Sequence, residues 1–307
     1  MKIVREIFPG RLQDRMEKAL EIVRDAQEIR IRVHSPIVIC SDGNEYFVTK
    51  SGQVTSQGNP EDKMIARDLE DIVYHICRSS LYAYEEELRR GYLTIEGGYR
   101  IGVTGQAVLD SSGCIKTIKN ISFLNIRIVH EIKGFGKKML PHLYKEGEIK
   151  NTLVISPPGY GKTTLLRDLL RMVSDGNEYA KGMQCCVIDE RSEVAGCFRG
   201  VPQLDVGIRT DVLDSCPKSI GMMMVIRSMA PQVIAIDELG TMEDIRSLFA
   251  VIRSGSHILA TIHGDGIADL KEKSFLNEVI KEKVFERYIV LRKNRDMDIY
   301  NGDFEKC

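Results

Sequence analysis

The chain has 307 residues, about the length of two average domains and too long for a small disulfide-stapled scaffold. Apolar residues make up 43% and charged residues 28% of the sequence, as in globular proteins, which argues against extended disorder. No stretch without a charged residue exceeds eleven residues, whereas a membrane-spanning helix needs about 20. The charged N-terminal segment lacks the apolar centre of a signal peptide, so we expect a cytoplasmic protein.

Cysteine spacing and charge exclude some classes of site. The eight cysteines are scattered, with no CxxC pair and no histidine cluster at metal-binding spacing, so we expect reduced thiols. The formal net charge is −1, and residues 1–133 carry 19 basic and 19 acidic side chains while residues 134–307 carry 24 and 25. A protein that follows a nucleic-acid backbone usually has a basic domain, so this balance disfavours nucleic acid as a partner.

The first 133 residues are predicted to form a smaller α+β domain. Apolar positions from Leu12 to Val23 recur every three or four residues, which predicts an amphipathic helix, and residues 28–33 alternate between apolar and charged as a half-exposed strand does. Other segments expected here are strands at 37–40 and 46–49, helices at 65–76 and 81–90, a hairpin of strands 92–96 and 99–104, a turn within 108–117 and a strand at 123–129. We place a flexible junction at 133–136, where two glycines interrupt the pattern.

Residues 134–307 are predicted to form an α/β domain around a phosphate-binding loop. An apolar strand at 152–155, a glycine-rich loop and a helical run follow one another, which is the context a P-loop requires. We expect Lys162 to reach the β- and γ-phosphates and Thr163 to hold Mg²⁺. Ser156 replaces the first glycine of the GxxxxGK[ST] pattern, at a position that we expect to tolerate it. The predicted ATP-binding residues are Ser156, Pro157, Pro158, Gly159, Tyr160, Gly161, Lys162, Thr163 and Thr164.

Two further apolar strands end in a pair of acids, and both pairs should reach the carboxyl-terminal edge of a parallel sheet. The second pair, Asp237 and Glu238, follows another helix at 220–229 and is the better candidate for the Walker B strand. We therefore assign Asp237 to the Mg²⁺ shell and Glu238 to the activation of water. For the first pair, Asp189 and Glu190, a strand-end salt bridge is the alternative to a catalytic role.

A histidine and several arginines complete the candidate catalytic set. The strand at 258–262 has two polar residues at its end, Thr261 and His263, and His263 either contacts the nucleotide and its sensing network or is structural. In a ring-forming ATPase, an arginine delivered across a domain or subunit boundary commonly stabilises the charge of the transition state. The candidates are Arg100, Arg127, Arg191, Arg199, Arg209 and Arg227. We favour Arg209 and Arg227 because both lie in the segment that leads into the second acidic strand.

At these residues the sequence resembles the stage III sporulation protein AA family of endospore-forming bacteria, relatives of the type II and type IV secretion ATPases. The resemblance covers nearly the full length, through blocks such as YAYEEELRRGYLTIEGGYRIGVTGQAV, TLVISPPGYGKTTLLRDLLR, VIDERSEVAG and ATIHGDG. It equates VIDERSEV with the Asp box of the secretion ATPases, near whose active site it places Asp189, Glu190 and Glu193, and ATIHG with their His box. Many of those enzymes have Gly-Glu where this chain has Asp237-Glu238.

The resemblance implies an α/β fold with a RecA-like P-loop ATPase core and a parallel sheet, preceded by the smaller α+β domain. It further implies an ATP hydrolase that uses ATP and Mg²⁺ and forms a homo-oligomeric ring, expected to be a hexamer. Such a ring acts at the cytoplasmic face of the mother-cell membrane, with membrane-embedded sporulation channel proteins as partners.

Two alternatives remain at this point. RecA-like cores also serve nucleic-acid-stimulated motors, and the first domain holds aromatic residues beside basic ones: Tyr82, Tyr84, Tyr92, Tyr99, Arg89, Arg90 and Arg100. Tyrosines near helices are more often core residues, and the neutral charge of 1–133 argues against this motor. A scaffold that binds ATP without turnover is the second alternative, which the complete set Lys162, Thr163, Asp237 and Glu238 disfavours.

Overall fold

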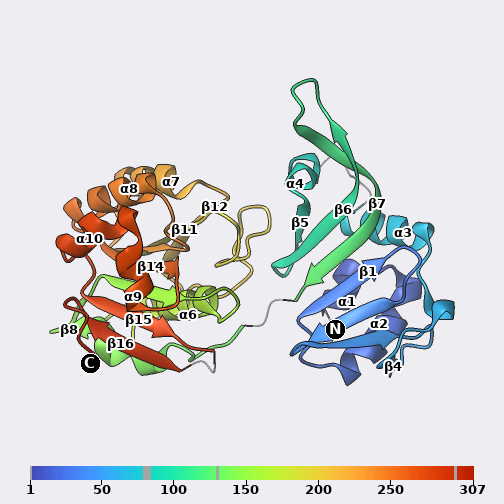
Figure 1. Cartoon of the computed structure of the whole chain (residues 1–307), viewed down its shortest axis with the longest axis horizontal. Helices are drawn as coiled ribbons and strands as arrows, with labels where there is room; N and C mark the ends of the chain where they lie inside the picture. Colours follow the sequence, from blue (N-terminus) through green and yellow to red (C-terminus); the bar gives the residue numbers. More distant parts are fainter. Residues whose placement is uncertain (1, 79–83, 129–130, 294–295) are drawn as a thin grey trace. The chain divides into compact units, whose positions relative to one another are not determined.

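A computed structural model describes residues 2–78, 84–128, 131–293 and 296–307 (Figure 1). The chain separates into two compact units, Met1–His130 and Glu131–Cys307, each built around its own hydrophobic core. The boundary expected from the sequence, after residue 133, lies three residues farther along the chain than this division.

The first unit is an antiparallel sheet packed on helices. Its strands lie in the order β4-β3-β2-β1-β7-β6-β5. Along β1, Ile29 and Ile31 are fully buried between half-exposed neighbours, so one face of the sheet packs on the helices and the other does not. The elements are α1 (Lys2–Ile7), α2 (Gly10–Ile22), β1 (Glu28–Arg32), β2 (Ile37–Ser41), β3 (Asn44–Val48), β4 (Val54–Thr55), η1 (Pro60–Asp62), α3 (Ala66–Ile76), α4 (Glu85–Arg89), β5 (Tyr92–Ile95), β6 (Tyr99–Leu109) and β7 (Ile115–Arg127).

Strands β6 and β7 are longer than predicted. They form one hairpin that projects from the sheet (Figure 1), because pairing continues to Leu109 and Ile115 while β1 pairs only with the far end of β7. Two register shifts interrupt the period-two pattern, which is why the sequence suggested separate segments. The helix expected at 81–90 corresponds to α4, and residues 81–83 lie outside the described part of the chain.

The second unit is a mostly parallel sheet with helices on both faces (Figure 1). Its strands lie in the order β12-β11-β13-β14-β10-β15-β16, and β16 pairs antiparallel with β15. The elements are η3 (Lys137–Met139), α5 (Leu140–Leu143), β8 (Tyr144–Lys145), β9 (Glu148–Ile149), β10 (Thr152–Ser156), α6 (Lys162–Asp175), β11 (Cys185–Asp189), β12 (Thr210–Asp214), α7 (Lys218–Ser228), β13 (Val233–Ile236), α8 (Met242–Arg253), β14 (His257–His263), α9 (Ile267–Glu272), η4 (Ser274–Leu276), α10 (Asn277–Lys281), β15 (Arg287–Leu291) and β16 (Met297–Asn301).

The sheet is buried on both sides, as the continuous apolar runs of its central strands require. Along β10, Val154 belongs to the core under α5 and α6, whereas Leu153 and Ile155 belong to the core under α7, α8, α9 and α10. Strand β14 lies between β10 and β13. Because these strands are parallel, their carboxyl ends meet at one edge, which brings the P-loop and both acid pairs to the same side of the sheet.

Gly134 and Gly136, where the sequence suggested a flexible junction, are both hydrogen-bonded to α6 in the structure. Their backbone N–H groups donate to the two carboxylate oxygens of Asp168 over 3.1 and 2.8 Å. A Cβ on Gly136 would lie 2.5 Å from the side chain of Leu169, so a larger residue there would require Leu169 to shift. Asp168 is buried and also accepts a hydrogen bond from Arg171, so moving this segment would leave a buried carboxylate with fewer partners.

Candidate active site

The P-loop joins the end of β10 to the start of α6. Gly159 and Gly161 have φ angles of +80° and +96°, in the left-handed region where other residues are strained, and Gly161 directly precedes the helix. Ser156 fits in place of the usual glycine, because its buried hydroxyl donates to the carbonyl of Pro157 over 2.9 Å. The loop therefore leads into a helix N-terminus, whose free N–H groups and dipole favour a phosphate group.

The second acid pair is the one that contacts the P-loop. The hydroxyl of Thr163 donates to Asp237 Oδ2 over 2.8 Å, and the hydroxyl of Thr261 donates to Asp237 Oδ1 over 2.6 Å. Thr261 is fully buried on β14, the strand between the P-loop strand and β13. The strand order thus fixes Asp237 beside Thr163, where two oxygen groups converge.

Glu238 has a left-handed backbone conformation, and hydrogen bonds to Thr261 stabilise it. Its φ angle is +63°, and a left-handed residue other than glycine costs on the order of 1 kcal/mol. Its N–H donates to the Thr261 hydroxyl over 2.8 Å, and the N–H of Leu239 donates to the Thr261 carbonyl over 2.8 Å. Thr261, which the sequence suggested only as a polar strand end, therefore holds both acids of the pair.

Three basic side chains surround the Glu238 carboxylate. Its Oε2 lies 3.9 Å from Lys162 Nζ and 3.5 Å from Arg191 Nη1, and its Oε1 lies 3.3 Å from His263 Nε2. Lys162 Nζ and His263 Nε2 are also 3.4 Å apart. His263 Nδ1 is buried and has no hydrogen-bond partner among the described residues. The structure therefore gathers Lys162, Glu238 and His263, all three predicted from the sequence, into one charged cluster.

The first acid pair has a different arrangement. Asp189 is buried, and its carboxylate accepts the backbone N–H groups of Glu193, Val194 and Ala195 over 2.8 to 3.0 Å. Burial raises the pKa of Asp189 to about 6, against the lowering effect of these three hydrogen bonds. Glu190 forms a salt bridge with Lys218, which is the strand-end arrangement that the sequence left as an alternative. Asp189 thus organises the loop that follows β11.

Arg167 holds the same loop from the other side. This buried residue of α6 donates from Nε to the carbonyl of Val194 and from Nη2 to the carbonyl of Glu193. Arg167 and Asp168 were not predicted from the sequence, although a charged pair between two leucine pairs of one helix indicates buried charges. The P-loop helix, the loop after β11 and the segment at 134–136 are therefore connected through two buried charged side chains.

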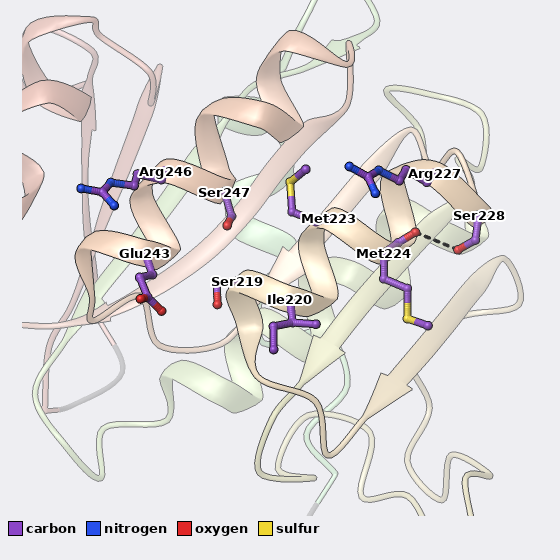
Figure 2. Close-up of a pocket in the computed structure, with 9 residues that line it drawn as sticks. All are labelled: Ser219, Ile220, Met223, Met224, Arg227, Ser228, Glu243, Arg246 and Ser247. Atoms are coloured by element: carbon purple, nitrogen blue, oxygen red, sulfur yellow. Dashed lines mark hydrogen bonds between the residues drawn. The ribbon is translucent and has the colours of Figure 1, made fainter.

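The two arginines favoured from the sequence are not brought to the P-loop within this unit. Arg209 directly precedes β12, and its Nη1 donates to the carbonyl of Ser174 over 3.0 Å near the end of α6. Arg227 lies in the last turn of α7 and lines a pocket of about 760 Å³ between α7 and α8 (Figure 2). Residues that precede a parallel strand lie at its amino edge, so nearness in sequence to β13 does not bring these arginines to the P-loop of the same unit.

The other candidate arginines differ in their surroundings. Arg191 contacts Glu238, whereas the guanidinium of Arg199 lies 5.3 Å from the ring centre of Phe198. In the first unit, Arg100 lies 3.8 Å from the ring centre of Tyr92, and Arg127 lies 4.0 Å from Glu28. Of the six arginines, Arg191 is the one with a contact to the charged cluster among the described residues.

The tyrosines that suggested nucleic-acid binding do not form a free stacking surface in the described part of the first unit. Tyr84 is buried in the core, Tyr99 packs against that core, and Tyr92 is covered by Arg100. Tyr82 lies outside the described residues.

The hydrogen bonds between Asp189 and the loop after β11 lead to a prediction for stability. Asp189→Asn replaces one acceptor oxygen with an amide donor that faces backbone N–H groups, so it should lower the free energy of unfolding by about 1–3 kcal/mol. Because the folded-state pKa of about 6 lies above the ordinary value of 3.8, the folded protein holds the proton of Asp189 more tightly, and the contribution of Asp189 to stability should fall as pH rises through this interval. Chemical denaturation between pH 4 and 7 measures both effects, with Asp211→Asn at an exposed position as the control. A pH slope that persists unchanged in Asp189→Asn would contradict this role.

Comparison with known proteins identifies relatives over the whole chain. The family model described as "Sporulation stage III, protein AA" matches residues 2–306. Stage III sporulation protein AA of Bacillus subtilis (strain 168) is 37% identical over 311 residues, which cover 100% of this chain and 95% of that protein. The uncharacterized protein ycf45 of Cyanidium caldarium is 27% identical over 172 residues, which cover 54% of this chain and 48% of that protein.

Solved structures share the fold at low sequence identity. The Legionella pneumophila ATPase DotB has a TM-score of 0.61 at 16% identity, covering 94% of this chain and 80% of that chain. The pilus retraction motor PilT, solved with ADP, has a TM-score of 0.61 at 13% identity, covering 92% and 81%. The chain therefore has the RecA-like α/β fold of the secretion ATPases, preceded by a smaller α+β unit. Among the described residues, no helix is both long and apolar enough to cross a bilayer.

Proposed function

The chain belongs to the sporulation stage III protein AA family, and from this premise we propose that it is a Mg²⁺-dependent ATPase of the secretion-ATPase type. The observation that carries the proposal is the 2.8 Å contact between Thr163 of the P-loop helix and Asp237 at the end of β13. This contact joins the two halves of a nucleoside triphosphate site, and Lys162 and Glu238 lie beside it.

Each residue has a distinct role in the proposed hydrolysis. Lys162 and the loop N–H groups bind and orient the β- and γ-phosphates. A water oxygen attacks the γ-phosphorus, the bond from that phosphorus to the bridging oxygen of ADP breaks, and Glu238 takes the proton that the water loses. His263 contacts both Lys162 and Glu238, so it is suited to keep the two side chains in place.

The oxygen groups at the site fit Mg²⁺. Thr163 Oγ1 and Asp237 Oδ2 are hard oxygen ligands that already converge, and Mg²⁺ in such sites takes one or two carboxylates together with substrate phosphates. No cluster of three or more metal-ligating His, Cys, Asp or Glu side chains occurs in the described part of the chain. When bound there, Mg²⁺ would neutralise charge on the phosphate oxygens.

Release of phosphate from ATP as a function of Mg²⁺ concentration tests this proposal. The wild type should hydrolyse ATP with Mg²⁺ and stop in EDTA. Asp237→Asn removes one negative ligand and should require at least about tenfold more Mg²⁺ for half-maximal turnover. Asp211→Asn, at an exposed position, is the matched control and should behave as the wild type. An Asp237→Asn protein with an unchanged Mg²⁺ requirement would contradict the assignment.

The proposal includes a ring, expected to be a hexamer, that acts with membrane-embedded channel proteins between mother cell and forespore. It is supported by membership of a sporulation family and by the fold shared with DotB and PilT. ATP should then favour the oligomer, because a ligand shifts an equilibrium by its differential affinity for the two states.

The proposed ring is tested separately from the ATPase activity. Full-length Glu238→Gln with Mg²⁺ and ATP is expected to sediment as a larger species than the same protein without nucleotide, because ATP stays bound. Sedimentation velocity measures the difference. A monomer at micromolar protein and saturating Mg-ATP, with full wild-type turnover under the same conditions, would contradict the ring.

A further inference from the structure

We propose that Arg191 is a phosphate-binding catalytic residue of the same subunit, which pairs with Glu238 in this structure and contacts the γ-phosphate when ATP is bound. This inference rests on the proposed ATPase function and adds to it the residue that recognises the third phosphate. Neither arginine favoured from the sequence has such a position within the second unit.

The first argument is that Lys162 and Arg191 lie close to the same carboxylate, that of Glu238. Both cations face the same oxygen, Glu238 Oε2, at 3.9 and 3.5 Å. A P-loop lysine contacts the β- and γ-phosphates, so a second cation near the same carboxylate oxygen lies close to the place where the γ-phosphate binds. A phosphate group in that place competes with Glu238 for Arg191, and guanidinium groups bind phosphate oxygens in pairs.

The second argument is the anchoring of the loop that carries Arg191. Asp189 accepts N–H groups of this loop, and Arg167 of the P-loop helix donates to its carbonyls. The base of the loop is therefore tied to β11 and to α6, while the Arg191 side chain is 61% exposed and can turn. An anchored loop backbone with a mobile guanidinium allows Arg191 to exchange the Glu238 carboxylate for a phosphate group.

The exchange also has a consequence for Glu238. While Arg191 Nη1 donates to Glu238 Oε2, that oxygen is not free to accept a proton from water. When Arg191 binds the γ-phosphate, it leaves Glu238, and Glu238 can then accept the proton from the attacking water. ADP has no γ-phosphate, so it should leave the Arg191–Glu238 pair intact.

Equilibrium binding of ADP and ATPγS, together with steady-state ATP turnover, tests the proposal in full-length protein. Arg191→Ala should weaken ATPγS binding by at least about tenfold, leave ADP affinity within about twofold, and lower kcat by roughly a thousandfold. Arg191→Lys keeps the charge without the planar fork, so it should recover part of the ATPγS affinity and less of kcat. Arg253→Ala, at an exposed position in the last turn of α8, is the control and should match the wild type.

The outcomes separate this proposal from the one it rests on. An unchanged ADP affinity in Arg191→Ala shows that the nucleotide site is folded. Equal losses for ADP and ATPγS, or wild-type kcat in Arg191→Ala, would overturn the role of Arg191 while leaving the ATPase assignment standing. A wild type that binds neither nucleotide and hydrolyses no ATP would overturn the proposed function itself.

Discussion

Lys162→Ala is expected to lose both ATP affinity and ATP turnover. The ammonium group is largely buried at the start of α6, and it is the P-loop cation that should contact phosphate in the ground state and in the transition state. Removing one charged hydrogen-bond donor should weaken ATP binding by roughly ten- to a hundredfold and bring turnover to background. Calorimetric titration with ATP and a phosphate-release assay measure the two effects.

The control for this variant is Lys181→Ala, at an exposed position between α6 and β11. It should bind and hydrolyse ATP as the wild type does. If Lys162→Ala kept wild-type binding and turnover, the loop at 156–164 would not be the phosphate site.

Glu238→Gln should retain ATP but slow its hydrolysis by about a hundredfold or more, as expected for loss of a positioned general base. Binding should survive because the amide keeps the shape of the side chain and removes a negative charge from beside the phosphates. Filter binding of labelled ATP and phosphate release measure the two properties on the same preparation.

Glu190→Gln is the matched variant on the neighbouring strand. Glu190 forms a salt bridge with Lys218, so its loss should reduce turnover less than the loss of Glu238. If Glu190→Gln were the inactive variant and Glu238→Gln the active one, the acid pair after β11 would be the catalytic one.

The parts of this site that could be predicted from the sequence are those in which neighbouring residues alone define the element. The loop from Ser156 to Thr164 stands in its strand-loop-helix context, and a short apolar strand ending in Asp237-Glu238 is a recognisable unit by itself. The choice between the two acid pairs used only the order of elements along the chain. The contact of Thr163 with Asp237 agrees with that choice.

The parts that the sequence did not predict depend on contacts between distant residues. The partner of Arg191 is 47 residues away, and that pairing depends on the position of β13 next to β11. Arg209 and Arg227 precede β13 in sequence, but residues that precede a parallel strand lie at the amino edge of the sheet. The P-loop and Asp237 lie at the opposite, carboxyl edge. The glycines at 134 and 136 looked like a hinge because sequence does not show the buried carboxylate of Asp168 that binds their N–H groups.

Single-turnover hydrolysis tests the central claim most directly. Wild-type protein in excess is loaded with γ-labelled ATP in EDTA, and Mg²⁺ is then added with excess unlabelled ATP. If Lys162, Thr163, Asp237 and Glu238 form a hydrolytic site, wild type should release labelled phosphate only after Mg²⁺ is added, and Glu238→Gln should hold intact labelled ATP over the same time. Wild-type protein that binds the labelled ATP and returns it intact after Mg²⁺ is added would contradict the account.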